Sequence, residues 1–195
     1  MANGNSAVFL DRDGVLTVPI FRDGRSYASQ TMEEYALYDA AAPAVAALKR
    51  AGFLTVVVTN QPAVGAGIIA METLEAMHAE LASRTDVDVI MACTHTKTDG
   101  CACRKPKAGM LLDAAATYDI DLTASFMVGD RKSDVDAGIE AGCRTVFLDL
   151  GYTAEEKPIN MDQTCSDIGQ AAEWIIDQMP ACGSVNKQTA QANSL

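Results

Sequence analysis

Short apolar segments alternate with helical segments along most of this chain, and this alternation constrains the fold more than any other feature. The apolar segments are rich in β-branched residues and bounded by polar or glycine residues, which is typical of buried strands. We predict strands at 7–10, 53–58, 87–92, 125–128 and 145–148, and helices at 43–51, 72–83, 109–118, 134–141 and 168–178. Strands that alternate with helices form βαβ units, so the sequence predicts an α/β fold in which helices cover both faces of a parallel sheet.

The size and composition of the chain indicate one compact domain. Its 195 residues are 49% hydrophobic, which is enough for a sizeable core. We expect that domain to cover 1–180 and a polar tail to follow at 181–195. The sequence has no apolar run of about 18 residues and no basic segment before an apolar one at its start, so we expect a cytoplasmic protein without a membrane partner.

The net charge of −11 argues against nucleic acid as a partner, because phosphate backbones require a basic surface. A small anionic substrate remains compatible with this charge, since the basic residues cluster in two predicted loops, 104–107 and 131–132. No heptad pattern or exposed apolar face stands out, and we therefore expect a monomer. The segment 17–31 is predicted to be a long polar loop, a length that is unusual unless the loop is functional.

The first predicted strand ends abruptly in two carboxylates, Asp11 and Asp13, followed by Gly14. Ligands of open α/β sheets usually bind at the carboxyl ends of the strands. Two carboxylates this close repel each other unless a positive charge lies between them, most simply a divalent cation. The segment therefore predicts an aspartate nucleophile beside a metal ion.

Two further segments supply groups that bind phosphate. Thr59 and Asn60 follow the second strand, and their hydroxyl and amide can hydrogen-bond phosphate oxygens, although both residues also favour turns and helix caps. Arg104 and Lys105 can neutralise the charge on a phosphoryl group in transfer, although alone they also fit an exposed basic loop.

A third segment, 128–134, again ends a strand in glycine and aspartate. Asp130 is a candidate ligand for Mg²⁺, which prefers oxygen ligands. Asp134 lies at the start of the next helix, where the helix dipole alone would favour a negative charge.

Four potential zinc ligands cluster in a polar loop: Cys93, His95, Cys101 and Cys103. In a cytosolic chain such a cluster indicates metal binding rather than disulfides. Three thiols and an imidazole complete a closed tetrahedral site, so the predicted Zn²⁺ is structural and would rigidify the following residues, Arg104 and Lys105.

Taken in order, these segments resemble the haloacid dehalogenase (HAD) superfamily of phosphatases. The resemblance rests on Asp11-x-Asp13-Gly14, Thr59, Lys105 and Gly129-Asp130-x-x-x-Asp134. The sequences 9–14, 59–61, 103–106, 109–111 and 127–130 are similar to the branch that contains heptose bisphosphate and histidinol-phosphate phosphatases. The resemblance implies a Rossmann-like three-layer sandwich with a zinc loop and no large cap domain.

The resemblance also implies residue roles. Asp11 would attack phosphorus to form an aspartyl phosphate, and Asp13 would act first as acid and then as base. Mg²⁺ would be bound by Asp11, by the backbone carbonyl of Asp13 and by Asp130. The remaining roles are phosphoryl binding by Thr59 and Lys105, substrate binding by Asn60, Arg104 and Arg131, and support of Lys105 or the metal's waters by Asp134.

The branch leaves the substrate open between two phosphate esters. The 7-phosphate of D-glycero-D-manno-heptose 1,7-bisphosphate, used in lipopolysaccharide, capsule or other glycan synthesis, suits a site with extra cations such as Arg104 and Arg131. Histidinol phosphate, an intermediate of histidine biosynthesis, would favour acidic groups instead. A catalytically silent binding protein on the same fold is a third reading, which the presence of both Asp11 and Asp13 disfavours.

Overall fold

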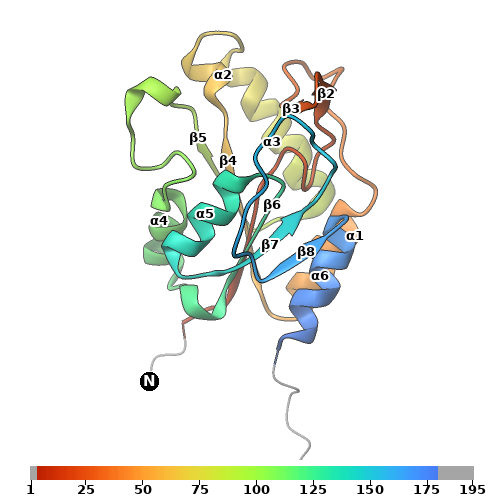
Figure 1. The fold of residues 1–195 in the computed structure, drawn as a ribbon, viewed down its shortest axis with the longest axis vertical. Helices are drawn as coiled ribbons and strands as arrows, with labels where there is room; N and C mark the ends of the chain where they lie inside the picture. The colour runs from red at the N-terminus through yellow and green to blue at the C-terminus, as the bar shows by residue number, and fades with distance from the viewer. Residues whose placement is uncertain (1–3, 180–195) are drawn as a thin grey trace, which may run out of the picture.

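A computed structural model describes residues 4–179, and within this range the chain forms a three-layer α/β sandwich (Figure 1). The central sheet has six parallel strands in the order β5-β4-β1-β6-β7-β8. These are β1 (Ala7–Leu10), β4 (Leu54–Asn60), β5 (Val89–Cys93), β6 (Phe126–Gly129), β7 (Arg144–Leu148) and β8 (Gln163–Cys165). The predicted tail at 181–195 lies outside the described residues.

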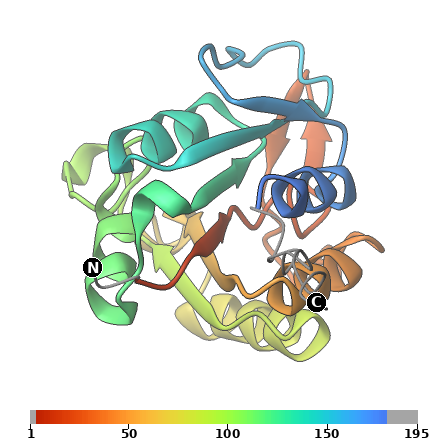
Figure 2. The same ribbon diagram turned by 90° about the horizontal axis from the view of Figure 1, so that it is seen from below.

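Helices pack on both faces of the sheet, as Figure 2 shows. On one face lie α1 (Ala41–Arg50), α3 (Met71–Thr85) and α6 (Ile168–Asp177), and on the other lie α4 (Gly109–Tyr118) and α5 (Lys132–Ala141). Alternate residues of β1 serve the two cores: Val8 and Leu10 pack toward the first group of helices, and Ala7 and Phe9 toward the second. The three-layer parallel architecture predicted from the alternating pattern is confirmed.

Every predicted strand and helix is present; β1 and α4 have the predicted ends, and the ends of the others are shifted. Helix α1 begins at Ala41 rather than 43, and α5 begins at Lys132 rather than 134. Strand β5 begins at Val89 rather than 87, and the Asp88 carboxylate just before it accepts hydrogen bonds from the backbone N–H and hydroxyl of Thr55. Strand β8 was not predicted, since its three residues are mostly polar and only Cys165 is buried.

The segment 17–31, expected to be a loop, contains a β-hairpin of β2 (Ile20–Arg22) and β3 (Arg25–Tyr27). Its turn residues Asp23 and Gly24 both have positive φ, 49° and 76°, and an Asp-Gly pair is a strong signal for such a turn. The remaining short elements are α2 (Pro62–Gly65) and the 3₁₀ helices η1 (Lys97–Asp99) and η2 (Leu122–Ala124). Residues 4–179 contain no large cap domain, and none of their helices is long and apolar enough to cross a membrane.

Candidate active site

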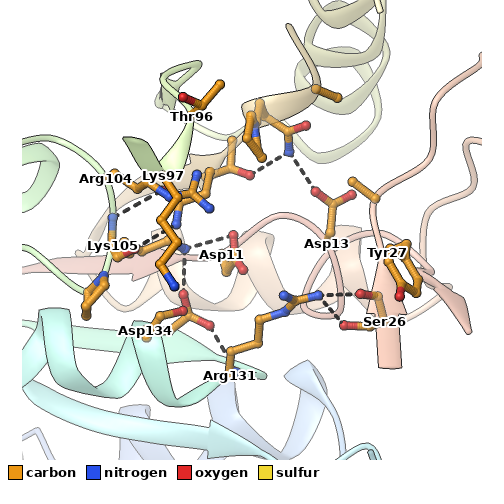
Figure 3. Close-up of a pocket in the computed structure, with 18 of the residues that line it drawn as sticks. Asp11, Asp13, Ser26, Tyr27, Thr96, Lys97, Arg104, Lys105, Arg131 and Asp134 are labelled. Carbon is orange, nitrogen blue, oxygen red and sulfur yellow. Dashed lines mark hydrogen bonds and ion pairs between the residues drawn. The ribbon is translucent and has the colours of Figure 1, made fainter. Parts of the chain in front are cut away.

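The carboxyl ends of β1, β4 and β6 meet at one edge of the sheet and bring the predicted residues together. Lys105 lies at the centre, with its side chain only 1% exposed. Its ammonium is 2.9 Å from Asp11 Oδ1 and 2.7 Å from Asp134 Oδ1 (Figure 3). It also donates to the carbonyl of Val58 at 2.7 Å. Lys105 therefore links the ends of β1 and β4 to the start of α5.

Burial sets the electrostatics of this cluster. Burial raises the pKa of Asp11 to about 6, an effect that the Lys105 charge opposes and the charges of Asp134 and Asp13 reinforce. For Lys105, burial favours the neutral amine, but Asp11 and Asp134 outweigh it and raise its pKa. Burial, together with the charges of Asp11 and Asp134, also raises the pKa of Asp130 well above its usual value. The carboxylates thus outnumber the cations that neutralise them.

The residues fit a hard divalent cation such as Mg²⁺. Asp11, Asp130 and Asp134 each offer a carboxylate oxygen, and these oxygens lie within 4.8 Å of one another. Asp130 Oδ2 accepts a hydrogen bond from the hydroxyl of Tyr152 at 2.7 Å, whereas Oδ1 is buried without a partner. An unpartnered buried carboxylate oxygen is costly, and a bound cation would satisfy it.

Gly14 allows this close arrangement. Its φ is +94°, and a β-carbon built there would lie 2.1 Å from Asp130 Oδ2. A larger residue would therefore displace Asp130 and strain the turn.

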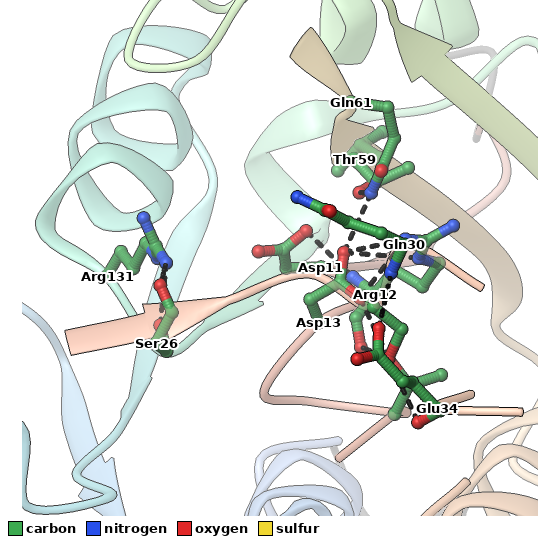
Figure 4. A network of polar contacts seen from close by, with 12 residues as sticks. Asp11, Arg12, Asp13, Ser26, Gln30, Glu34, Thr59, Gln61 and Arg131 are labelled. Atoms are coloured by element: carbon green, nitrogen blue, oxygen red, sulfur yellow. Dashed lines mark hydrogen bonds and ion pairs between the residues drawn. The ribbon is translucent and has the colours of Figure 1, made fainter. Parts of the chain in front are cut away.

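The carboxylate of Asp13 has different neighbours from those the sequence predicted. Arg12 donates to both of its oxygens at 3.0–3.2 Å, and Gln61 donates to Oδ2 at 2.7 Å (Figure 4). Each carboxylate of the Asp11–Asp13 pair thus has a cation of the protein itself, Lys105 for Asp11 and Arg12 for Asp13. These two side chains offset part of the repulsion between Asp11 and Asp13, from which a cation between them was predicted.

Thr59 and Asn60 lie beside Lys105 at the end of β4. Thr59 is buried, and its hydroxyl accepts a hydrogen bond from Gln61 at 2.8 Å. The side-chain amide of Asn60 bonds the backbone of Lys105 in both directions, accepting at 3.1 Å and donating at 3.0 Å. Asn60, predicted to contact substrate, therefore also holds the backbone of Lys105 in place.

An open cleft of about 970 Å³ lies above this cluster. Asp11, Asp13 and Thr59 line it, with Arg104 and Arg131 among the lining residues. The Arg131 guanidinium donates to the carbonyl and hydroxyl oxygens of Ser26 in β3, the latter at 2.6 Å, and so ties the hairpin to the start of α5 (Figure 3). The hairpin forms a wall of the cleft, with Arg25, Ser26 and Tyr27 among the lining residues.

The four predicted zinc ligands converge beside the cleft. The sulfur of Cys103 lies 3.2 Å from that of Cys93, 3.4 Å from that of Cys101 and 3.3 Å from Nδ1 of His95. Cys93 Sγ is 3.7 Å from Cys101 Sγ and 3.6 Å from His95 Nδ1. Zn–S bonds of about 2.3 Å in a tetrahedron require separations of about 3.8 Å, so this donor set fits Zn²⁺ with small adjustments.

Sequence reasoning assigned no role to three residues of the site. Arg12 and Gln61 contact Asp13, and Tyr152 contacts Asp130. Arg12 and Gln61 adjoin motif residues, which was a usable signal, whereas Tyr152 lies in the connection between β7 and β8 and carries no local motif.

Comparisons with known proteins agree with this fold and site. Residues 102–171 match the HAD-hydrolase-like family. The chain is 35% identical over 191 residues to the D-glycero-beta-D-manno-heptose-1,7-bisphosphate 7-phosphatase of Photorhabdus laumondii, covering 92% of this chain and 94% of that one. It is 38% identical over 149 residues to the enzyme of the same name from Pseudomonas putida, covering 74% and 82%.

A solved structure is similar to this chain in both fold and sequence. The D,D-heptose 1,7-bisphosphate phosphatase from B. bronchiseptica, complexed with magnesium and phosphate, has a TM-score of 0.76 and 31% identity, covering 89% of this chain and 99% of that one. The chain belongs to the HAD-like phosphatase family and is a phosphoric monoester hydrolase. Within that family its similarity is to the heptose bisphosphate phosphatases named above.

Proposed function

We propose that this protein hydrolyses the 7-phosphate of D-glycero-D-manno-heptose 1,7-bisphosphate for the synthesis of lipopolysaccharide, capsule or another heptose-containing glycan. The observation that carries the chemistry is the buried cluster of Asp11, Lys105 and Asp134 at the floor of the cleft. The substrate rests on relatives of that activity, one of which matches nearly the full length of this chain.

The proposed reaction has two steps. In the first, a carboxylate oxygen of Asp11 attacks phosphorus, the bond from phosphorus to the sugar oxygen breaks, and Asp13 gives its proton to that oxygen. In the second, Asp13 takes a proton from water, the resulting hydroxide attacks phosphorus, and Asp11 leaves as a carboxylate. Inorganic phosphate and the dephosphorylated sugar are the products.

The neighbouring residues would neutralise the transferred phosphoryl group. The Lys105 ammonium adjoins Asp11 and is suited to stabilise the charge on the equatorial oxygens, with the Thr59 hydroxyl as a further donor. Asp11, Asp130 and the backbone carbonyl of Asp13 would hold Mg²⁺, which supplies charge neutralisation between nucleophile and phosphate. Asp134 contributes by holding Lys105 at 2.7 Å.

The cleft wall would select the substrate. Arg104 and Asn60 are proposed to contact its hydroxyls or distal phosphate, and Arg131 would act there together with the hairpin that it holds. The Cys93, His95, Cys101 and Cys103 site is proposed to bind a structural Zn²⁺ that fixes Arg104 and Lys105, the residues after its last ligand. We further propose a cytoplasmic monomer.

Phosphate release from a substrate panel tests the proposal. The panel contains the heptose bisphosphate, histidinol phosphate and common hexose monophosphates, each assayed with Mg²⁺. We expect kcat/KM to be highest for the heptose bisphosphate by at least about tenfold, which corresponds to about 1.4 kcal/mol of differential binding. Comparable values on all substrates would refute the substrate assignment, and a preference for histidinol phosphate would assign the chain to histidine biosynthesis.

A further inference from the structure

The carboxylate of Asp13 is enclosed by side-chain donors that come from two separate segments of the chain. Arg12 donates through Nε to Oδ2 at 3.2 Å and through Nη2 to both oxygens, at 3.1 and 3.0 Å. Gln61, which lies 48 positions away, donates to Oδ2 at 2.7 Å, and the hydroxyl of Thr17 donates to Oδ1 at 3.1 Å. Figure 4 shows Arg12 and Gln61 converging on Asp13 from different elements.

Arg12 is buried to an unusual degree for an arginine, with a side chain that is 0% exposed. Its Nη1 has no hydrogen-bond partner, and its guanidinium lies 5.6 Å from the ring centre of Tyr35. Burying an arginine costs free energy that only good pairing offsets, and Asp13 is the carboxylate with which it pairs. The fork of the guanidinium also fixes the plane of the carboxylate, which a single donor would not do.

Gln61 joins Asp13 to the phosphate-binding end of β4. Its Nε2 donates both to Asp13 Oδ2 at 2.7 Å and to Thr59 Oγ1 at 2.8 Å, and the residue is 1% exposed. The side-chain amide of Gln61 therefore sets the distance between Asp13, the proposed acid and base, and the phosphate-binding hydroxyl proposed for Thr59.

We propose that Arg12 and Gln61 are positioning residues that hold the Asp13 carboxylate at the edge of the cleft for proton transfer to the leaving oxygen. The inference rests on the role of Asp13 in the proposed function. In the step concerned, the bond from phosphorus to the sugar oxygen breaks, its electron pair passes to that oxygen, and the Asp13 proton binds there. A small displacement of the donor costs such a step up to about 100-fold in rate.

Leaving-group dependence separates positioning from a merely structural role. A sugar alkoxide requires a proton as it leaves, whereas 4-nitrophenolate does not. The ratio of kcat/KM for heptose bisphosphate to kcat/KM for 4-nitrophenyl phosphate therefore reports proton donation, and it does not change when a variant merely contains fewer folded molecules. Because kcat/KM covers only the steps up to release of the leaving group, the later use of Asp13 as a base does not enter it.

The variants are Gln61→Met, which keeps the volume and removes both hydrogen bonds, and Arg12→Lys, which keeps the charge and removes the fork. Gln170→Met, in the first turn of α6, is the matched control. We expect the ratio to fall by about 10- to 100-fold in both site variants and to stay within about twofold of wild type in the control. If Arg12→Lys does not fold, Gln61→Met alone carries the test.

The Asp13→Asn variant tests the acid role of Asp13 separately from the positioning roles of Arg12 and Gln61. If the ratio falls in Asp13→Asn but is unchanged in Gln61→Met and Arg12→Lys, the positioning role is wrong and Asp13 remains the acid. A residue whose variant leaves the ratio unchanged loses its positioning role. If the ratio does not fall in Asp13→Asn, the proposed acid is itself wrong.

Discussion

Replacing Lys105 by methionine should destabilise the protein more than any exposed lysine substitution. The Lys105 ammonium has three partners, at 2.9 Å from Asp11, 2.7 Å from Asp134 and 2.7 Å from the Val58 carbonyl, and its side chain is 1% exposed. Methionine fills a similar volume but leaves two buried carboxylates without their cation. Breaking a buried ion pair by removing one partner costs about 3–5 kcal/mol.

The measurement is the free energy of unfolding from urea titration followed by circular dichroism, in buffer without Mg²⁺. We expect a loss of about 3–5 kcal/mol for Lys105→Met and a clearly smaller loss for the control Lys49→Met, which removes a partly exposed pair with Asp86 and Asp88. In an Asp134→Asn background the loss should be smaller by about 0.5–3 kcal/mol, because one of the stranded charges is already gone. A loss below about 1 kcal/mol for Lys105→Met would show that the two buried carboxylates do not depend on the Lys105 charge.

Three further predictions concern the zinc cluster, the Asp130 partner and acid stability. The purified protein should contain about one zinc per chain by elemental analysis, and Cys101→Ser should remove most of it while Cys165→Ser does not; equal zinc in both variants would contradict the assignment. Tyr152→Phe should weaken Mg²⁺ binding to the metal-free site by about 10- to 100-fold in calorimetric titration, and an unchanged affinity would show that the hydroxyl is dispensable. Burial, and after it the Arg12 charge, lower the pKa of His78 to about 4. Between about pH 6.5 and pH 4 the unfolded chain therefore binds a proton that the folded chain excludes, and the free energy of unfolding should fall as the pH drops through this range. His78→Gln should flatten that decline, and equal slopes for both proteins would show that His78 does not cause it.

The sequence was sufficient to predict five of the six strands of the central sheet and the residues at its edge. Apolar runs such as β1 and β4 have few alternatives to burial, and the residues that follow them must reach the same edge of a parallel sheet. Asp11, Lys105 and Asp134 were predicted from separate motifs, and the structure places them in direct contact.

The partners of these residues were less accessible to sequence reasoning. Gln61 contacts Asp13 across 48 positions and Tyr152 contacts Asp130 across 22, and neither spacing follows from local periodicity. The hairpin was missed for a different reason, because its three-residue strands are too short to show alternation, although the Asp23-Gly24 turn marked its position.

Asp11 is proposed to carry the phosphoryl group between the two steps, and trapping that group on the protein would identify the residue that holds it. The Asp13→Asn variant should form the phosphoenzyme from 4-nitrophenyl phosphate, whose leaving group needs no proton, and should hydrolyse it slowly without its base. Acid quenching followed by borohydride reduction converts an aspartyl phosphate to homoserine, which peptide mass spectrometry locates. We predict homoserine at position 11, dependent on substrate and Mg²⁺. Homoserine at another position would show that Asp11 is not the nucleophile, and so would the absence of homoserine while a stoichiometric burst of nitrophenolate is released.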